Sequence, residues 1–154
     1  MADTNKIEIQ INGLDQLFKK LNNYPAVSEP HVNKAINRSL VRILGQEKQQ
    51  APVFTGNLRD NWKIDLDRFQ GALRSNAPYS MAVHFGSRPH MPPISAITPW
   101  ALKKGLNPWA VAKSIAKNGT KANPFLQKAV DLERDNVNKE FKEALDNIAR
   151  DLAN

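Results

Sequence analysis

The side chains that could act as acids, bases or metal ligands are few in this sequence. It holds 3 histidines and no cysteine. His84 and His90 lie six positions apart with no carboxylate near either one, and His31 is far away in the chain. Zinc sites use three or four ligands at characteristic spacings. We therefore expect no metal site, and we interpret His84 as a partly exposed residue of a sheet.

Acidic pairs and catalytic motifs are equally scarce. Asp65 and Asp67 fall on the polar side of an alternating stretch, where acids usually serve solubility, and Asp60 interrupts the apolar side alone. A paired-carboxylate mechanism needs a second, opposed acid. The signatures G-x-S-x-G, G-x-x-x-x-G-K-[ST], G-x-G-x-x-G and H-E-x-x-H are absent. Without cysteine there is also no thiolate nucleophile. We expect a protein that is not an enzyme, with no catalytic residue and no cofactor.

Positive charge is concentrated in one part of the chain. The formal net charge is +7, with 18 Lys and Arg against 8 Asp and Glu in residues 1–128 but 4 against 7 in residues 129–154. No acidic residue occurs between Asp67 and Asp131. Such a surface suits a polyanion or an acidic partner. A solvated basic face balanced by an acidic terminal helix is the alternative interpretation.

The first third of the chain predicts one short strand and two helices. Alternation of apolar and polar residues predicts a strand over 6–11, and leucines at helical spacing predict a short amphipathic helix over 14–21. Ser28 can cap a second, long helix. We expect that helix to end near Gln50, because the residue before Pro52 is disfavoured in the helical region.

The next segment predicts the rest of a sheet. Thr55-Gly56-Asn57 reads as a turn in which Gly56 takes a positive φ. Alternation then predicts a strand over 58–67, a second strand around 72–76 and a third over 79–85. Three sequential strands joined by short turns predict an antiparallel meander.

Prolines mark a predicted loop and three predicted helix starts in the second half of the chain. The proline-rich residues 86–97 predict a loop that projects from the sheet. Three later tripeptides each combine a capping residue, a proline and an aromatic, and so predict helix starts: Thr98-Pro99-Trp100, Asn107-Pro108-Trp109 and Asn123-Pro124-Phe125. Helical periodicity places both of these tryptophans in the core.

The last predicted helix is unusually long for the domain. A continuous helix over 124–153 would be about 45 Å long, more than this small domain is expected to cover. We expect part of it to pack on another chain, and a break near 134–136 is the alternative. The predicted fold class is α+β: a small antiparallel β-meander plus an N-terminal strand, packed against a long helix, with a helical insertion at 98–119 and a long C-terminal helix, in a single domain over 1–154.

The order of these landmarks resembles one protein family. G-L-D-Q-L at 13–17, A-P-V-F-T-G-N-L-R at 51–59, A-P-Y-S-M-A-V-H-F-G-S at 77–87 and N-P-F-L-Q-K-A at 123–129 occur in the order seen in tail-completion or head-tail joining proteins of long-tailed bacteriophages and prophages. The sequence departs from this family at His84, where relatives often have an acid before F-G-T. The segment 98–119 resembles an insertion that only some relatives carry.

The resemblance implies a non-enzymatic structural virion protein. Such a protein forms a ring at the phage neck or tail end, between the head connector and the tail-tube or tail-terminator proteins, and DNA passes through the lumen. The expected partners are copies of the same chain, those neighbouring proteins and, transiently and without sequence preference, DNA. The expected location is the virion, after assembly in the cytoplasm of the host bacterium.

Interface residues are predicted from the projecting loop and the polar side of the sheet. The expected contacts are Arg88, Pro89, His90, Met91, Pro92 and Pro93, with Arg59 and Lys63 as weaker candidates. Neighbours in a ring could pair the basic middle of one chain with the acidic terminal helix of the next. No run of roughly 18 apolar residues is present, so no membrane partner is expected.

Two further functions stay open at this point. One is a basic nucleic-acid-binding accessory protein that contacts DNA independently of sequence. The other, a more distant alternative, is a hydrolase with an unrecognised site.

Overall fold

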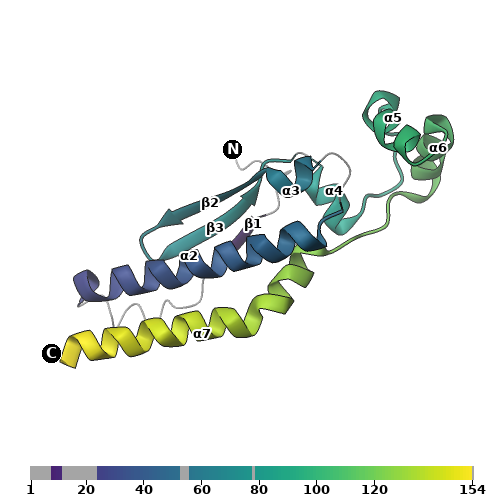
Figure 1. Cartoon of the computed structure of the whole chain (residues 1–154). Coiled ribbons are helices and arrows are strands. Elements are labelled where there is room, and N and C mark those ends of the chain that lie inside the picture. The colour runs from purple at the N-terminus through teal and green to yellow at the C-terminus, as the bar shows by residue number, and fades with distance from the viewer. Residues whose placement is uncertain (1–7, 12–23, 53–55, 78, 154) are drawn as a thin grey trace.

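A three-stranded antiparallel sheet, helix α2 and helix α7 are stacked in that order (Figure 1). The computed structural model describes residues 8–11, 24–52, 56–77 and 79–153. The helix predicted over 14–21 lies outside the described residues. Helix α2, Pro25–Gln50, packs on the sheet with one side and on α7, Phe125–Ala153, with another. The α+β class is therefore confirmed.

The sheet has the strand order β1-β3-β2. Strand β1 spans Glu8–Ile11, β2 spans Trp62–Asp67 and β3 spans Gln70–Ser75. Leu73 in the central strand pairs with Ile9 on one side and Ile64 on the other, and it is fully buried against α2. Alternation thus correctly predicted these three strands, because each has one apolar face on the core.

The predicted third strand of the meander is wrong. Residues Ser80–Phe85 form helix α4. A short alternating stretch can also be read as a helical turn. Here the helix buries Ser80 and His84, which are four residues apart and therefore lie on one face. His84 is consequently a buried helical residue and not a partly exposed sheet residue.

The long helix α2 ends where it was predicted to end but begins earlier. Ala51 is extended at φ −66° and ψ 136°, as expected before a proline. The helix starts at Pro25, and Ser28 lies inside its first turn, where its hydroxyl donates to the Tyr24 carbonyl at 3.0 Å. A residue at the first helical position needs no partner for its amide, so a proline fits there. Pro25 therefore marks the start of α2, and Ser28 does not.

The segment after Gly56 begins with a helical turn and not with a strand. Gly56 has φ 82°, which confirms the predicted positive φ. Residues Asn57–Asp60 then form α3, and β2 begins only at Trp62. Leu58 points into the core from this turn, and Asp60 does not interrupt the apolar face of a strand.

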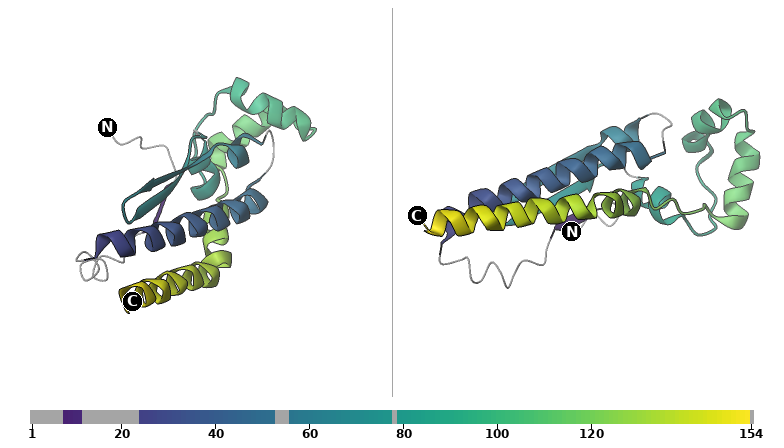
Figure 2. Two further views of the ribbon diagram at one scale, coloured as in Figure 1. Left: turned by 60° about the vertical axis from the view of Figure 1, so that its left-hand side comes forward. Right: turned by 60° about the horizontal axis from the view of Figure 1, so that its bottom comes forward.

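Helix α7 is one continuous helix that bends after its first turns and then runs antiparallel along α2 (Figures 1 and 2). The break considered near 134–136 is absent. Because α2 spans 26 residues and α7 spans 29, α2 covers most of the length of α7. The length of α7 therefore does not by itself require a second chain.

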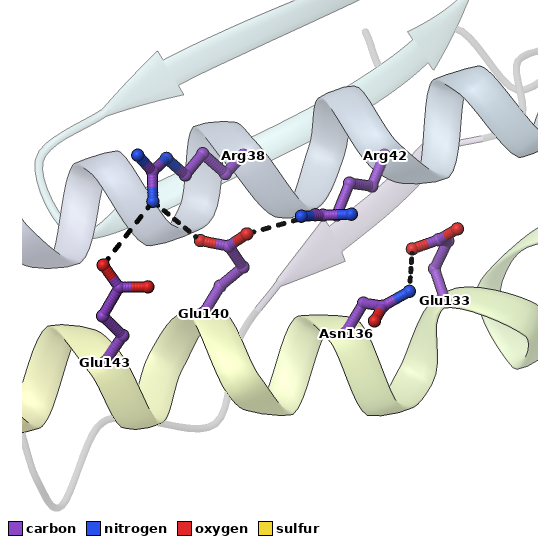
Figure 3. Close-up of polar contacts among 6 residues, drawn as sticks. All are labelled: Arg38, Arg42, Glu133, Asn136, Glu140 and Glu143. Carbon is purple, nitrogen blue, oxygen red and sulfur yellow. Dashed lines mark hydrogen bonds and ion pairs between the residues drawn. The ribbon is translucent and has the colours of Figure 1, made fainter.

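Carboxylates of α7, of which Glu140 is buried, join that helix to α2 (Figure 3). Glu140 is 9% exposed and accepts hydrogen bonds from Arg38 Nη1 at 3.3 Å and Arg42 Nε at 3.1 Å. Arg38 also lies 3.8 Å from Glu143, and His31 meets Asp151 at 2.7 Å. Several carboxylates of α7 therefore pair with side chains of α2 in the same chain. Fewer of them remain to pair with the basic residues of a neighbouring subunit.

Candidate assembly surface

Helices α5 and α6 form a hairpin that stands away from the sheet and from the α2–α7 pair (Figures 1 and 2). Helix α5 spans Ile94–Lys103 and α6 spans Pro108–Asn118. Within the described part of the chain, these two helices pack closely only against each other. We call α5, α6 and the turn between them the hairpin.

Two antiparallel segments form the stalk of the hairpin. Ser87 and Thr120 exchange both backbone hydrogen bonds, at 3.2 and 3.1 Å, and their hydroxyls bond at 2.9 Å. The His90 amide also donates to the Ile115 carbonyl. Gly119 makes this close approach possible, because it has φ 71° and a Cβ there would lie 2.0 Å from the Ser87 carbonyl oxygen.

The Gly119→Ala variant is expected to disrupt the stalk and leave the core intact. An added Cβ must displace the Ser87 backbone, and the conformation of Gly119, φ 71° and ψ −162°, costs about 1 to 3 kcal/mol for alanine. Amide hydrogen exchange should become faster at Ser87 and Thr120 but not in β3. Gly105→Ala is the matched control, since Gly105 has φ 69° but no atom near its Cβ position. Equal exchange at the stalk in both variants would contradict this role for Gly119.

The predicted helix starts are right for α6 and α7 and wrong for α5. Asn107 caps α6 by accepting from the amides of Trp109 at 2.9 Å and Ala110 at 3.3 Å. Helix α7 begins at Phe125. Helix α5 begins at Ile94, so Pro99 lies inside it. The Thr98 hydroxyl donates to the Ile94 carbonyl and therefore does not cap a helix start.

The hairpin exposes large apolar side chains. Trp109 is 58% exposed and Leu102 is 64% exposed, and Trp100 and Leu106 are exposed as well; Met91, in the adjoining arm of the stalk, is also exposed. The prediction that Trp100 and Trp109 belong to the core is wrong. The small residues Ala101 and Ala112 are fully buried where α5 packs on α6. Because the contact between these two short helices is made by small residues, it does not cover their larger side chains.

The loop predicted to form an interface is the outgoing arm of the stalk. Arg88, Pro89, His90, Met91 and Pro93 are exposed, whereas Pro92 is buried. Five of the six predicted residues are thus accessible beside the hairpin. Their role in an interface stays a prediction.

Arg59 and Lys63, the weaker candidates, lie elsewhere and both have acidic partners. Arg59 belongs to the turn α3 and not to the sheet, and its Nε lies 3.2 Å from Asp60. Lys63 lies on β2 with its Nζ 2.8 Å from Asp65, which also pairs with Arg74. The structure does not bring these two residues together with the projecting loop.

The titratable residue His84 is built into the packing of the body. His84 lies between Phe85 and Phe125, with ring centroids 4.5 and 5.3 Å away, and burial lowers the pKa of its imidazole.

Among the described residues, no group of three or more His, Cys, Asp or Glu is placed to hold a metal ion. No described helix is long and apolar enough to cross a membrane.

Sequence reasoning missed the exposed apolar residues of the hairpin. Trp100 and Leu102 are two positions apart, which puts them on different faces of α5, and Leu106 lies in the turn. A short helix with large apolar residues on more than one face cannot bury all of them against a single partner helix. That signal was present in the sequence.

A comparison with protein families links this structure to bacteriophages. Residues 15–86 match the family model described as "Bacteriophage HK97-gp10, putative tail-component". The matched range ends at the base of the stalk, so the hairpin and α7 lie outside it. No curated protein and no solved structure matches the chain. The predicted resemblance is thus confirmed over residues 15–86, which are similar to the HK97-gp10-like family of bacteriophage tail components.

Proposed function

We propose that the chain is a non-enzymatic structural protein of a phage virion that assembles as a ring at the neck or tail end. There it joins or completes the tail, and DNA passes through its lumen. The match of residues 15–86 to a family of tail components supports a place in the tail. Copies of the chain and the adjacent head-connector, tail-tube or tail-terminator proteins are the proposed partners.

The hairpin is the observation that carries this proposal. It holds the exposed Trp100, Leu102 and Leu106, which we call the apolar tip, away from the body, on a stalk fixed by reciprocal hydrogen bonds. Large exposed apolar side chains gathered in one place typically mark interaction sites, and Trp and Met are enriched in interfaces. A projection that reaches a different surface of the next copy makes a head-to-tail contact, which closes into a ring when the rotation allows.

Loss of the apolar tip of the hairpin is expected to prevent assembly. The variant Leu102→Ser/Leu106→Ser removes two exposed apolar side chains and should leave the melting temperature nearly unchanged. Light scattering and negative-stain microscopy should show rings for the wild-type chain, alone or with the neck and tail-tube proteins of the same phage. The variant should stay monomeric under both conditions.

The matched control is Leu132→Ser, which removes an exposed leucine of α7 and should still assemble. Normal rings from the hairpin variant would contradict the role given to the hairpin. A wild-type chain that never forms rings with those partners, yet binds DNA with a steep salt dependence, would support the alternative of a nucleic-acid-binding accessory protein.

A further inference from the structure

One exposed face of α6 carries a row of cationic side chains. Trp109, Lys113 and Lys117 follow one another at every fourth position, which places them on one face of the helix, and all three are exposed. Lys121 is also exposed and follows in the returning arm of the stalk. We call Trp109, Lys113, Lys117 and Lys121 the α6 stripe.

The charges of the stripe are not neutralised by the described part of the chain. Residues 86–123 contain six Lys and Arg and no Asp or Glu. Lys113, Lys117 and Lys121 have no acidic partner among the described residues. Several arginines of the body do meet a carboxylate: Arg38, Arg42, Arg68 and Arg74. What distinguishes the stripe is its place in a segment without acids, where its row of positive charges is not offset.

We propose that the α6 stripe binds the phosphate backbone of duplex DNA without regard to sequence. Side chains four residues apart on a helix lie about 6 Å from one another, so Lys113 and Lys117 can contact phosphates along one strand. The exposed indole N–H of Trp109 can donate to a further phosphate oxygen. Phosphate contacts of this kind set position but read no bases.

Lysine chemistry favours DNA over an acidic protein as the partner of the stripe. Lysine is depleted at the centres of protein interfaces, whereas a row of lysines gains affinity from phosphates by releasing condensed counterions. The inference deepens the proposed function and rests on it for its setting, since a ring around the tail lumen would enclose DNA. The apolar tip and the stripe would then meet different partners.

The test measures DNA binding by the purified full-length chain. Fluorescence anisotropy with labelled duplexes of about 25 base pairs, in two unrelated sequences, is recorded at NaCl concentrations between about 50 and 200 mM. The variant Lys113→Gln/Lys117→Gln should bind both duplexes about tenfold more weakly. It should also lower the slope of log K against log salt by about 2, because each of the two lysines neutralises one phosphate.

The matched control is Lys139→Gln/Lys142→Gln, which removes two exposed charges from α7 and should leave affinity and slope nearly unchanged. No binding by the wild type at about 50 mM NaCl, or equal weakening in both variants, would overturn the inference. Unchanged DNA affinity in the stripe variant together with a failure to form rings would identify the stripe as a protein contact and would overturn it too. Rings without DNA binding refute only this inference, and DNA binding without rings refutes only the proposed function.

Discussion

The free energy of unfolding of the wild-type chain is expected to fall by about 3 kcal/mol between pH 4.5 and about pH 7, because of Glu47. The Glu47→Gln variant is expected to abolish this fall. Glu47 lies in the last turn of α2 and is 0% exposed. Neither of its carboxyl oxygens has a hydrogen-bond partner, and the indole nitrogen of Trp62 has none either. Burial is the largest effect and raises the pKa of Glu47 from 4.5 to about 7; it outweighs the opposite effects of the neighbouring Trp62 indole, which faces the carboxyl group without a well-formed hydrogen bond, and of the Lys48 charge.

The direction of this effect follows from proton binding. Between pH 4.5 and about 7 the folded chain keeps a proton on Glu47 that the unfolded chain has released. The free energy of unfolding therefore falls as pH rises through that window, and the contribution of Glu47 is fully present only below pH 4.5. His84 acts oppositely, because its lowered pKa makes the fold less stable as pH falls.

Urea unfolding at a series of pH values isolates the contribution of Glu47. Subtracting the wild-type curve from the variant curve removes the contributions of His84 and other groups that both proteins share. Glu143→Gln makes the same chemical change at an exposed position of α7 and should leave the pH profile nearly unchanged. Parallel profiles for Glu47→Gln and the wild type would show that Glu47 ionises normally in the folded chain.

The Phe125→Ala variant is expected to lower the free energy of unfolding by about 3 to 5 kcal/mol, because it leaves a large cavity in the core. Phe125 is 0% exposed. Its ring packs edge-on against Trp62 of β2 at 6.5 Å and against His84 of α4 at 5.3 Å. One side chain at the start of α7 thus ties that helix to the sheet and to α4.

Phe85→Ala is the matched control, because Phe85 is 64% exposed and its truncation should cost less than about 1 kcal/mol. Histidine titration by NMR gives a second measurement. Opening the site of Phe125 should rehydrate His84 and move its lowered pKa toward 6.5. Similar destabilisation by the two variants would contradict the central position given to Phe125.

Local signals predicted several elements correctly because backbone chemistry alone defines them. Pro52 ended α2, the side chain of Asn107 capped α6, and Gly56 took a positive φ. Alternation identified β2, whose Trp62 and Ile64 pack on the core, and the turn before β3 indicated that strand. The projecting loop was foreseen over 86–93, because three prolines and a glycine leave few amide donors and little regular structure, but residues 94–97 belong to α5.

The sequence by itself therefore determined the α+β class, the end of α2, the starts of α6 and α7, the phage-tail resemblance and the excess of positive charge before α7. Only the tertiary structure decided which residues are buried. It folded 80–85 into a helix against Phe125, left Trp100 and Trp109 exposed, and enclosed Glu47. The physical reason is that periodicity states which side chains share a face, whereas burial depends on whether a distant segment covers that face. For α7 that segment is α2, and for the outer face of the hairpin the described part of the chain offers none.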